Sequence, residues 1–252
     1  MPFAPLPDGG RVHYVERGEA RDGAPPALLV HGAGASSAIW AMTMGRLARV
    51  GRVVALDLPG HGASPLPEGG AAALTLAGYR EAVGALARTL ALGPSVLVGH
   101  SMGGMVAIEA ALARPEAVRA LVLCGTAPRL PVREELLALI REDHARVPEW
   151  MAEHGLSPRV KPAVRRGFVA AGAVAPADVT LADFAAVRAT DLTARLAALA
   201  CPVVWLDGAD DLIAPASTGR PGDVRTLDGV GHVIPVEAPG AVAEAVTALL
   251  AV

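Results

Sequence analysis

Short apolar segments alternate with longer stretches rich in alanine, leucine and charged residues along most of the chain. A short, mostly apolar run is typical of a strand buried on both faces of a parallel sheet. Runs of this kind lie at 27–30, 52–56, 95–98, 118–123 and 203–206, with a weaker one at 223–227. Two more segments, 3–6 and 12–16, flank Asp8-Gly9-Gly10 and predict an antiparallel hairpin.

Predicted helices fill the spaces between these strands, at 37–49, 74–92, 102–114 and 239–250. Such alternation predicts a parallel sheet with crossover helices. The segment 126–200 breaks the pattern, because it contains no convincing strand and carries amphipathic helical stretches at 133–147 and 181–199. We therefore expect a core formed by residues 1–125 and 201–252, with 126–200 inserted as a helical cap. Long insertions often form lids or substrate walls.

Composition narrows the function classes. The chain has 252 residues, 52 % of them hydrophobic and 19 % charged, which suits one packed domain. A net charge of −3 gives no reason to expect nucleic acid or an anionic membrane as a partner. Cys124 and Cys201 make no disulfide framework, and neither a metal-binding motif nor a signal peptide is evident. We expect a cytoplasmic protein without metal or cofactor; its oligomeric state stays open.

The strongest chemical motif is Gly99-His100-Ser101-Met102-Gly103, between a predicted strand and a predicted helix. This is the context of a G-x-S-x-G nucleophile elbow, in which a strained turn lifts the serine hydroxyl clear of the sheet. The flanking glycines let strand and helix approach closely. A serine at a helix N-terminus also lies beside free N–H groups that favour a developing anion. Ser101 is therefore the candidate nucleophile.

A serine needs a base, and the base needs a carboxylate. Of seven histidines, only His232 follows the last predicted strand and precedes the last predicted helix, where loops at the carboxyl ends of the strands converge. Three aspartates, Asp207, Asp210 and Asp211, follow the strand at 203–206. We favour Asp211, and Asp210 remains the alternative acid. The predicted oxyanion donors are the backbone N–H groups of Met102 and Ala33.

Several motifs together resemble the α/β-hydrolase superfamily over nearly the whole chain. They are His31-Gly32-Ala33-Gly34, the segment 57–64, the elbow with Gly104, Gly208-x-x-Asp211 and Gly231-His232. The resemblance implies an α/β-hydrolase fold: a mostly parallel, twisted sheet with helices on both faces and a helical cap after the sixth strand. Within the superfamily the chain is similar to small bacterial serine esterases and enol-lactonases with a short cap. Asp57 and His61 then have structural roles.

The expected reaction is hydrolysis of a carboxylic ester or lactone of a small-to-medium apolar substrate through an acyl-enzyme. Candidate pocket residues are Gly32, Trp40, Met102, Trp150, Phe168, Phe184, Ile213 and Val233. The cap aromatics among them have a second interpretation, which is that they only hold the cap on the core.

The sequence leaves other functions open. Cofactor-free perhydrolases or haloperoxidases and carbon–carbon bond hydrolases share the Ser-Met-Gly-Gly elbow, and some relatives of this fold act as ligand receptors. The segment 32–37 nearly matches a dinucleotide-binding turn, because Gly32-x-Gly34 is followed by Ser36 and, at the third glycine position, by Ser37, with Asp57 ending the next strand. That reading lacks the third glycine and explains neither the elbow nor His232.

Overall fold

The computed structural model describes residues 2–21, 23–171, 175–214, 216 and 218–250. Eight strands form one sheet in the order β1-β2-β4-β3-β5-β6-β7-β8. Their bounds are Phe3–Pro5 (β1), Arg11–Arg17 (β2), Ala27–Val30 (β3), Val53–Leu56 (β4), Ser95–His100 (β5), Val118–Cys124 (β6), Val203–Gly208 (β7) and Asp223–Leu227 (β8). The β1–β2 and β2–β4 pairs are antiparallel, and the remaining pairs are parallel. The α/β-hydrolase fold expected from the sequence is confirmed.

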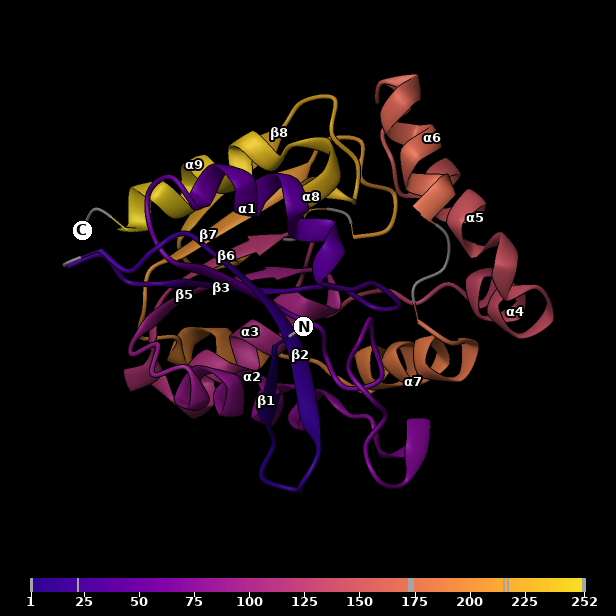
Figure 1. Ribbon diagram of the computed structural model, residues 1–252. Coiled ribbons are helices and arrows are strands. Elements are labelled where there is room, and N and C mark those ends of the chain that lie inside the picture. The colour runs from indigo at the N-terminus through magenta and orange to yellow at the C-terminus, as the bar shows by residue number, and fades with distance from the viewer. Residues whose placement is uncertain (1, 22, 172–174, 215, 217, 251–252) are drawn as a thin grey trace.

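Helices cover both faces of the sheet (Figure 1). The helices α1 and α9 lie on one face, with the short α8 beside them, and α2 and α3 lie on the other. Their bounds are Ala41–Leu47 (α1), Leu76–Thr89 (α2), Met102–Ala113 (α3), Ile234–Glu237 (α8) and Pro239–Leu250 (α9). The central strands β3 and β4 are buried at every position, as two-sided coverage requires.

Between β6 and β7 the chain leaves the sheet, and its described residues there form four α-helices, which we call the cap helices. They are Glu134–Glu142 (α4), Val147–His154 (α5), Pro162–Ala171 (α6) and Ala177–Arg188 (α7). In Figure 1 they lie on the right, beyond the carboxyl ends of the central strands. None of the helices in the described ranges is both long enough and apolar enough to cross a membrane.

Three helical predictions differ from the structure in detail. The stretch 133–147 is interrupted, because α4 ends at Glu142 and a 3₁₀ turn, His144–Arg146, precedes α5. The stretch 37–49 begins as a 3₁₀ turn, Ser37–Trp40, capped by the Ser36 side chain, before α1 starts. The stretch 181–199 is not one helix, because α7 ends at Arg188 and a 3₁₀ helix follows at Thr193–Ala198. Asp191 accepts a hydrogen bond from the Thr193 N–H at 2.9 Å, and such a local side-chain turn competes with a continuous helix.

The sheet register brings the chemically interesting loops to one edge. Val30 pairs with Gly99, and His100 pairs with Cys124, so β3, β5 and β6 end side by side. The Gly125 N–H donates to Leu206 O at 2.9 Å, which ties the start of the cap segment to β7. The loops that follow these strands therefore meet at the carboxyl edge, where ligands bind in open α/β sheets.

Candidate active site

Ser101 occupies a strained turn between β5 and α3. Its φ is +52° and its ψ −121°, a left-handed conformation that is unusual for a residue other than glycine. Glycines make the turn possible: a Cβ at Gly99 would lie 2.4 Å from Gly103 O, and one at Gly103 would lie 2.3 Å from Val30 O. The strand and helix therefore cross in direct backbone contact, and Ser101 stands at the N-terminus of α3.

The turn after β3 lies directly against this serine. A Cβ at Gly32 would come within 3.2 Å of Ser101 Cβ and 3.0 Å of His100 Nδ1, so a side chain there would have to push the elbow away by a few tenths of an ångström. Gly32 O accepts hydrogen bonds from His31 Nδ1 at 2.8 Å and from the Ala35 N–H at 3.2 Å. We call residues 31–35 the oxyanion loop. Ala33, one of the two predicted oxyanion donors, lies in this loop, and Met102, the other, is the first residue of α3.

His232 lies in the loop after β8 and is nearly fully buried. Its Nδ1 donates to Asp211 Oδ2 at 3.0 Å. Asp211 Oδ1 accepts from the Ile213 and Ala214 N–H groups, each at 2.8 Å. Burial opposes the charge on Asp211, but these hydrogen bonds and His232 outweigh it and hold the pKa of the carboxyl below its usual range. Asp211 is thus an ionised group that orients the imidazole.

The two neighbouring aspartates have other partners. Asp210 accepts from the Ser157 hydroxyl at 2.6 Å and pairs with Arg159 at 3.1 Å. Asp207 forms a buried ion pair with Arg220. The carboxylate that the structure brings to His232 is that of Asp211.

His100, the residue before the serine, is buried between the oxyanion loop and the His232 loop. Its Nε2 donates to His232 O at 3.0 Å, while Nδ1 has no hydrogen-bond partner. Burial and the nearby His232 lower the pKa of His100 to about 3, so its ring stays neutral. His31 is also neutral, because Nδ1 donates to Gly32 O and Nε2 accepts from the Leu58 N–H at 3.0 Å.

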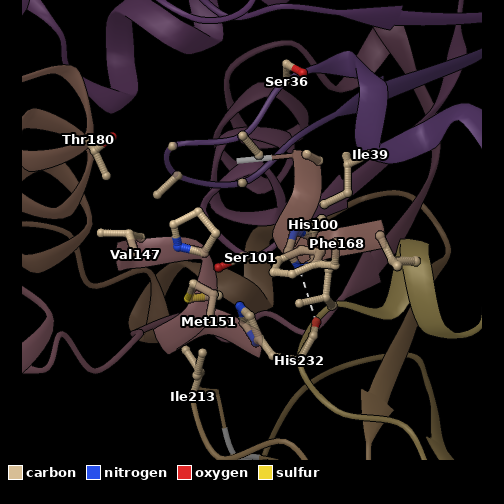
Figure 2. A pocket seen from close by; sticks show the side chains of 18 of the residues that line it. Ser36, Ile39, His100, Ser101, Val147, Met151, Phe168, Thr180, Ile213 and His232 are labelled. Atoms are coloured by element: carbon tan, nitrogen blue, oxygen red, sulfur yellow. Dashed lines mark hydrogen bonds between the residues drawn. The ribbon is translucent and has the colours of Figure 1, made fainter. Parts of the chain in front are cut away.

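Ser101 and His232 open into a cavity of about 390 Å³ between the core and the cap helices. In Figure 2 their side chains lie close to one another, ringed by Val147, Met151 and Phe168. Of the predicted pocket residues, Gly32, Phe168, Phe184, Ile213 and Val233 line this cavity. The predicted oxyanion residue Ala33 lines it as well.

Three predicted pocket positions were wrong. The Trp40 side chain is fully buried in the apolar cluster under α1 and α9, on one face of the sheet. Trp150 packs against the cluster around α4 and stacks on His154, with ring centroids 4.3 Å apart. The Met102 side chain is buried in the core below the elbow. The alternative interpretation, that the cap aromatics hold the cap on the core, does not describe Trp150 either, because the cluster it packs against lies within the segment 126–200.

Two helix faces of the cavity went unrecognised in the sequence. On one face, His144 from the 3₁₀ turn before α5 and Val147, Pro148 and Met151 from α5 line the cavity; on the other, Val164, Gly167 and Ala171 line it from α6 beside the predicted Phe168. Their spacings of three and four residues mark one face of a helix. That periodicity was the available signal, although it could not say whether the face meets a cavity or the core.

Known proteins resemble this chain in sequence and in structure. The sequence profile of the alpha/beta hydrolase family matches residues 27–245. The chain belongs to this family. Among the relatives of this α/β-hydrolase is RutD of Klebsiella pneumoniae subsp. pneumoniae, named as a carbamate hydrolase, which is 32 % identical over 79 % of this chain and 78 % of its own. The pimeloyl-[acyl-carrier protein] methyl ester esterase of Yersinia pseudotuberculosis is 30 % identical over 75 % of this chain and 76 % of its own.

Solved structures agree with the sequence comparison. A thermophilic esterase from Thermogutta terrifontis superposes on this α/β-hydrolase with a TM-score of 0.85 and 26 % identity, covering 99 % of this chain and 97 % of that one. These three proteins are named as a carbamate hydrolase and two esterases, and together with the family match they support a hydrolase of this family. Within the described ranges, no cluster of three or more His, Cys, Asp or Glu side chains could hold a metal ion.

Proposed function

We propose that this chain is a serine hydrolase that cleaves carboxylic esters or lactones of small-to-medium, uncharged apolar substrates through an acyl-enzyme. The observation that carries the proposal is the meeting of a strained serine elbow and an Asp211-bound His232 in one cavity. A serine hydroxyl beside an oriented imidazole is the arrangement of nucleophilic acyl transfer.

Each residue has a defined role in the proposed reaction. His232 takes the proton of Ser101 as Oγ attacks the carbonyl carbon, and Asp211 stabilises the resulting imidazolium. The oxyanion accepts hydrogen bonds from the Met102 and Ala33 N–H groups. His232 returns the proton to the leaving alcohol, and water then repeats the sequence on the acyl-enzyme. This chemistry calls for no metal or organic cofactor.

The cavity lining supports an uncharged substrate. Its described residues are mainly aliphatic and aromatic, and none is Lys, Arg, Asp or Glu. A substrate carboxylate or ammonium would be removed from water there without an opposite charge, which is costly. The volume lies near the lower end for ligand pockets. We propose that the segment 126–200 acts as the cap that sets the acyl preference, because α5 and α6 supply much of this apolar wall.

The test is hydrolysis of p-nitrophenyl acetate, butyrate and octanoate by the wild type and by Ser101→Ala, with EDTA present. Ser95→Ala is the matched control, since Ser95 begins β5, the strand that leads to Ser101, and its hydroxyl donates to Gly93 O, away from the cavity. We expect steady turnover that only Ser101→Ala abolishes. A wild type without turnover, or equal rates in the wild type and Ser101→Ala, would contradict the proposal and favour a ligand receptor.

A further inference from the structure

A buried polar cluster connects the cap helices to the oxyanion loop, and the proposed mechanism does not use it. Its centre is Asp183 on α7, whose side chain is fully buried. Asp183 Oδ1 accepts a hydrogen bond from the Tyr79 hydroxyl. Asp183 Oδ2 accepts from His61 Nε2 at 2.8 Å and from the Gly34 N–H at 2.9 Å. One cap carboxylate thus binds two core side chains and the backbone of the oxyanion loop.

The hydrogen-bond partners define the charges in this cluster. His61 Nε2 faces the Asp183 carboxylate, and His61 Nδ1 faces Pro59 O at 3.1 Å, so both ring nitrogens meet acceptors. A histidine that donates from both nitrogens is an imidazolium. Although burial opposes the charge, Asp183 raises the pKa of His61 above its usual range. Asp183 and His61 therefore form a buried ion pair, and the carboxylate is available to the Gly34 N–H.

The cluster holds one of the two peptides that flank Ala33. The peptide before Ala33 carries Gly32 O, which is held by His31 Nδ1 from the core. Because a peptide is planar and trans, fixing this carbonyl also fixes the direction of the Ala33 N–H. The peptide after Ala33 carries the Gly34 N–H, which is held by Asp183 from the cap. A second cap bond, from the Ala175 N–H to Gly34 O at 3.3 Å, acts on the same residue.

We propose that Asp183 is a positioning residue, which holds the oxyanion loop from the cap and makes oxyanion stabilisation depend on a docked α7. This inference rests on the proposed function, because it assigns the Ala33 N–H to the oxyanion. A carboxylate with a purely structural role needs no bond to this loop, and buried ion pairs can often be replaced by apolar side chains without loss of stability. The bond to Gly34 is the feature that such a replacement would lose.

Four variants separate positioning from structural support. Asp183→Leu removes the acceptor of the Gly34 N–H. Tyr79→Phe removes only the donor to the other carboxylate oxygen and so disturbs the cluster without releasing Gly34. Arg188→Gln breaks a surface ion pair between α7, the helix that carries Asp183, and Glu134 of α4. The triple variant Asp183→Leu/His61→Met/Tyr79→Phe removes the buried charges together, and it allows the measurement if the single variant does not fold.

The readout compares two ligands of the same length. 1,1,1-Trifluorooctan-2-one adds to Ser101 Oγ as the serine proton passes to His232, which gives a hemiketal whose oxyanion occupies the oxyanion site. Octan-2-one fills the same cavity without a stable adduct. The inhibition constant of octan-2-one divided by that of the trifluoroketone therefore reports oxyanion stabilisation, and a larger ratio means a better stabilised oxyanion. It is measured beside kcat/KM for p-nitrophenyl butyrate and the thermal midpoint of every variant.

We expect Asp183→Leu and the triple variant to lower this ratio and kcat/KM by about 10- to 100-fold, somewhat less than the loss of one oxyanion donor. Octan-2-one should bind them as it binds the wild type. Tyr79→Phe should lower the thermal midpoint but change the ratio less than about threefold, since it removes one buried hydrogen bond and leaves the bond from the Gly34 N–H to Asp183 in place. Arg188→Gln should match the wild type in both readouts.

The outcomes distinguish the two proposals. A wild type that hydrolyses no ester and binds both ketones equally would overturn the serine hydrolase and this inference together. A wild type that does both, with Asp183→Leu and the triple variant equal to it, would overturn the role of Asp183 alone. A loss in Tyr79→Phe as large as that in Asp183→Leu would also overturn it, because the effect would then follow cluster stability.

Discussion

Acidification from pH 7 to pH 5 should destabilise this protein through two buried neutral histidines. Burial and the neighbouring His232 lower the pKa of His100 to about 3, and burial and His61 lower the pKa of His31 to about 4. In the unfolded chain both take up a proton near pH 6.5. The unfolded state thus binds protons that the native state does not, and the free energy of unfolding falls as the pH drops below 6.5.

The size of the effect follows from these pKa values. Between pH 7 and pH 5 each histidine should remove about 2 kcal/mol from the free energy of unfolding, or about 4 kcal/mol together. That is a large part of the 5–15 kcal/mol typical of a domain. His61 acts in the opposite sense: its pKa is raised, so its stabilisation is fully present below pH 6.5 and is lost only as the pH rises through the raised value.

Urea unfolding followed by circular dichroism at half-unit steps from pH 5 to pH 8 measures the effect. The comparison is with His100→Gln, which keeps an N–H donor for His232 O but cannot titrate. The variant should lose about 2 kcal/mol less than the wild type between pH 7 and pH 5, because one proton is no longer taken up on unfolding. Above pH 7 the two curves should run parallel. Parallel curves down to pH 5 would refute the assignment of a neutral, buried His100.

Three substitutions test the rest of the site. Asp211→Asn should lower kcat for p-nitrophenyl butyrate by about 10⁴-fold. Asp210→Asn should lower it less than about fivefold, because the Asp210 carboxylate pairs with Arg159 at the surface. The reverse order would reassign the catalytic acid to Asp210. Phe168→Ala enlarges the cap side of the cavity and should shift the preferred p-nitrophenyl ester toward octanoate; an unchanged profile would place the acyl chain elsewhere. Gly103→Ala should cost about 3 kcal/mol or more in urea unfolding, because its Cβ would meet Val30 O at 2.3 Å; a wild-type midpoint would contradict the close packing.

The sequence was most informative where local patterns decide the structure. The buried strands are short apolar runs, and the elbow depends on glycines at fixed offsets, so both could be predicted without knowing the tertiary arrangement. Trp40 shows the limit of this reasoning. It ends a single 3₁₀ turn, too short for a periodicity to indicate a face. Ile39, its neighbour, lines the cavity instead.

The helices between β6 and β7 could be expected from the sequence, but their arrangement could not. The cavity lies between helix faces whose relative placement depends on tertiary contacts. Asp183 stands in an alanine-rich helical segment with nothing nearby to mark it as buried. Its partners Gly34, His61 and Tyr79 come from three separate parts of the core, more than a hundred residues earlier in the chain. Only a folded structure brings such a cluster together.

The insertion of the cap helices between β6 and β7 has a consequence for how this protein can be altered. Those two strands pair along Leu121–Cys124 and Val203–Leu206, so the intervening chain is a closed loop on a complete sheet. Doubling the length of a flexible loop costs only about 0.6 kcal/mol. We therefore expect that the inserted segment can be replaced by another one. The replacement must keep an acceptor for the Gly34 N–H and a second acceptor, like Gly155 O, for the His232 N–H. The exchangeable unit is the wall of the pocket, and two contacts to backbone N–H groups of the core are among the constraints on grafting.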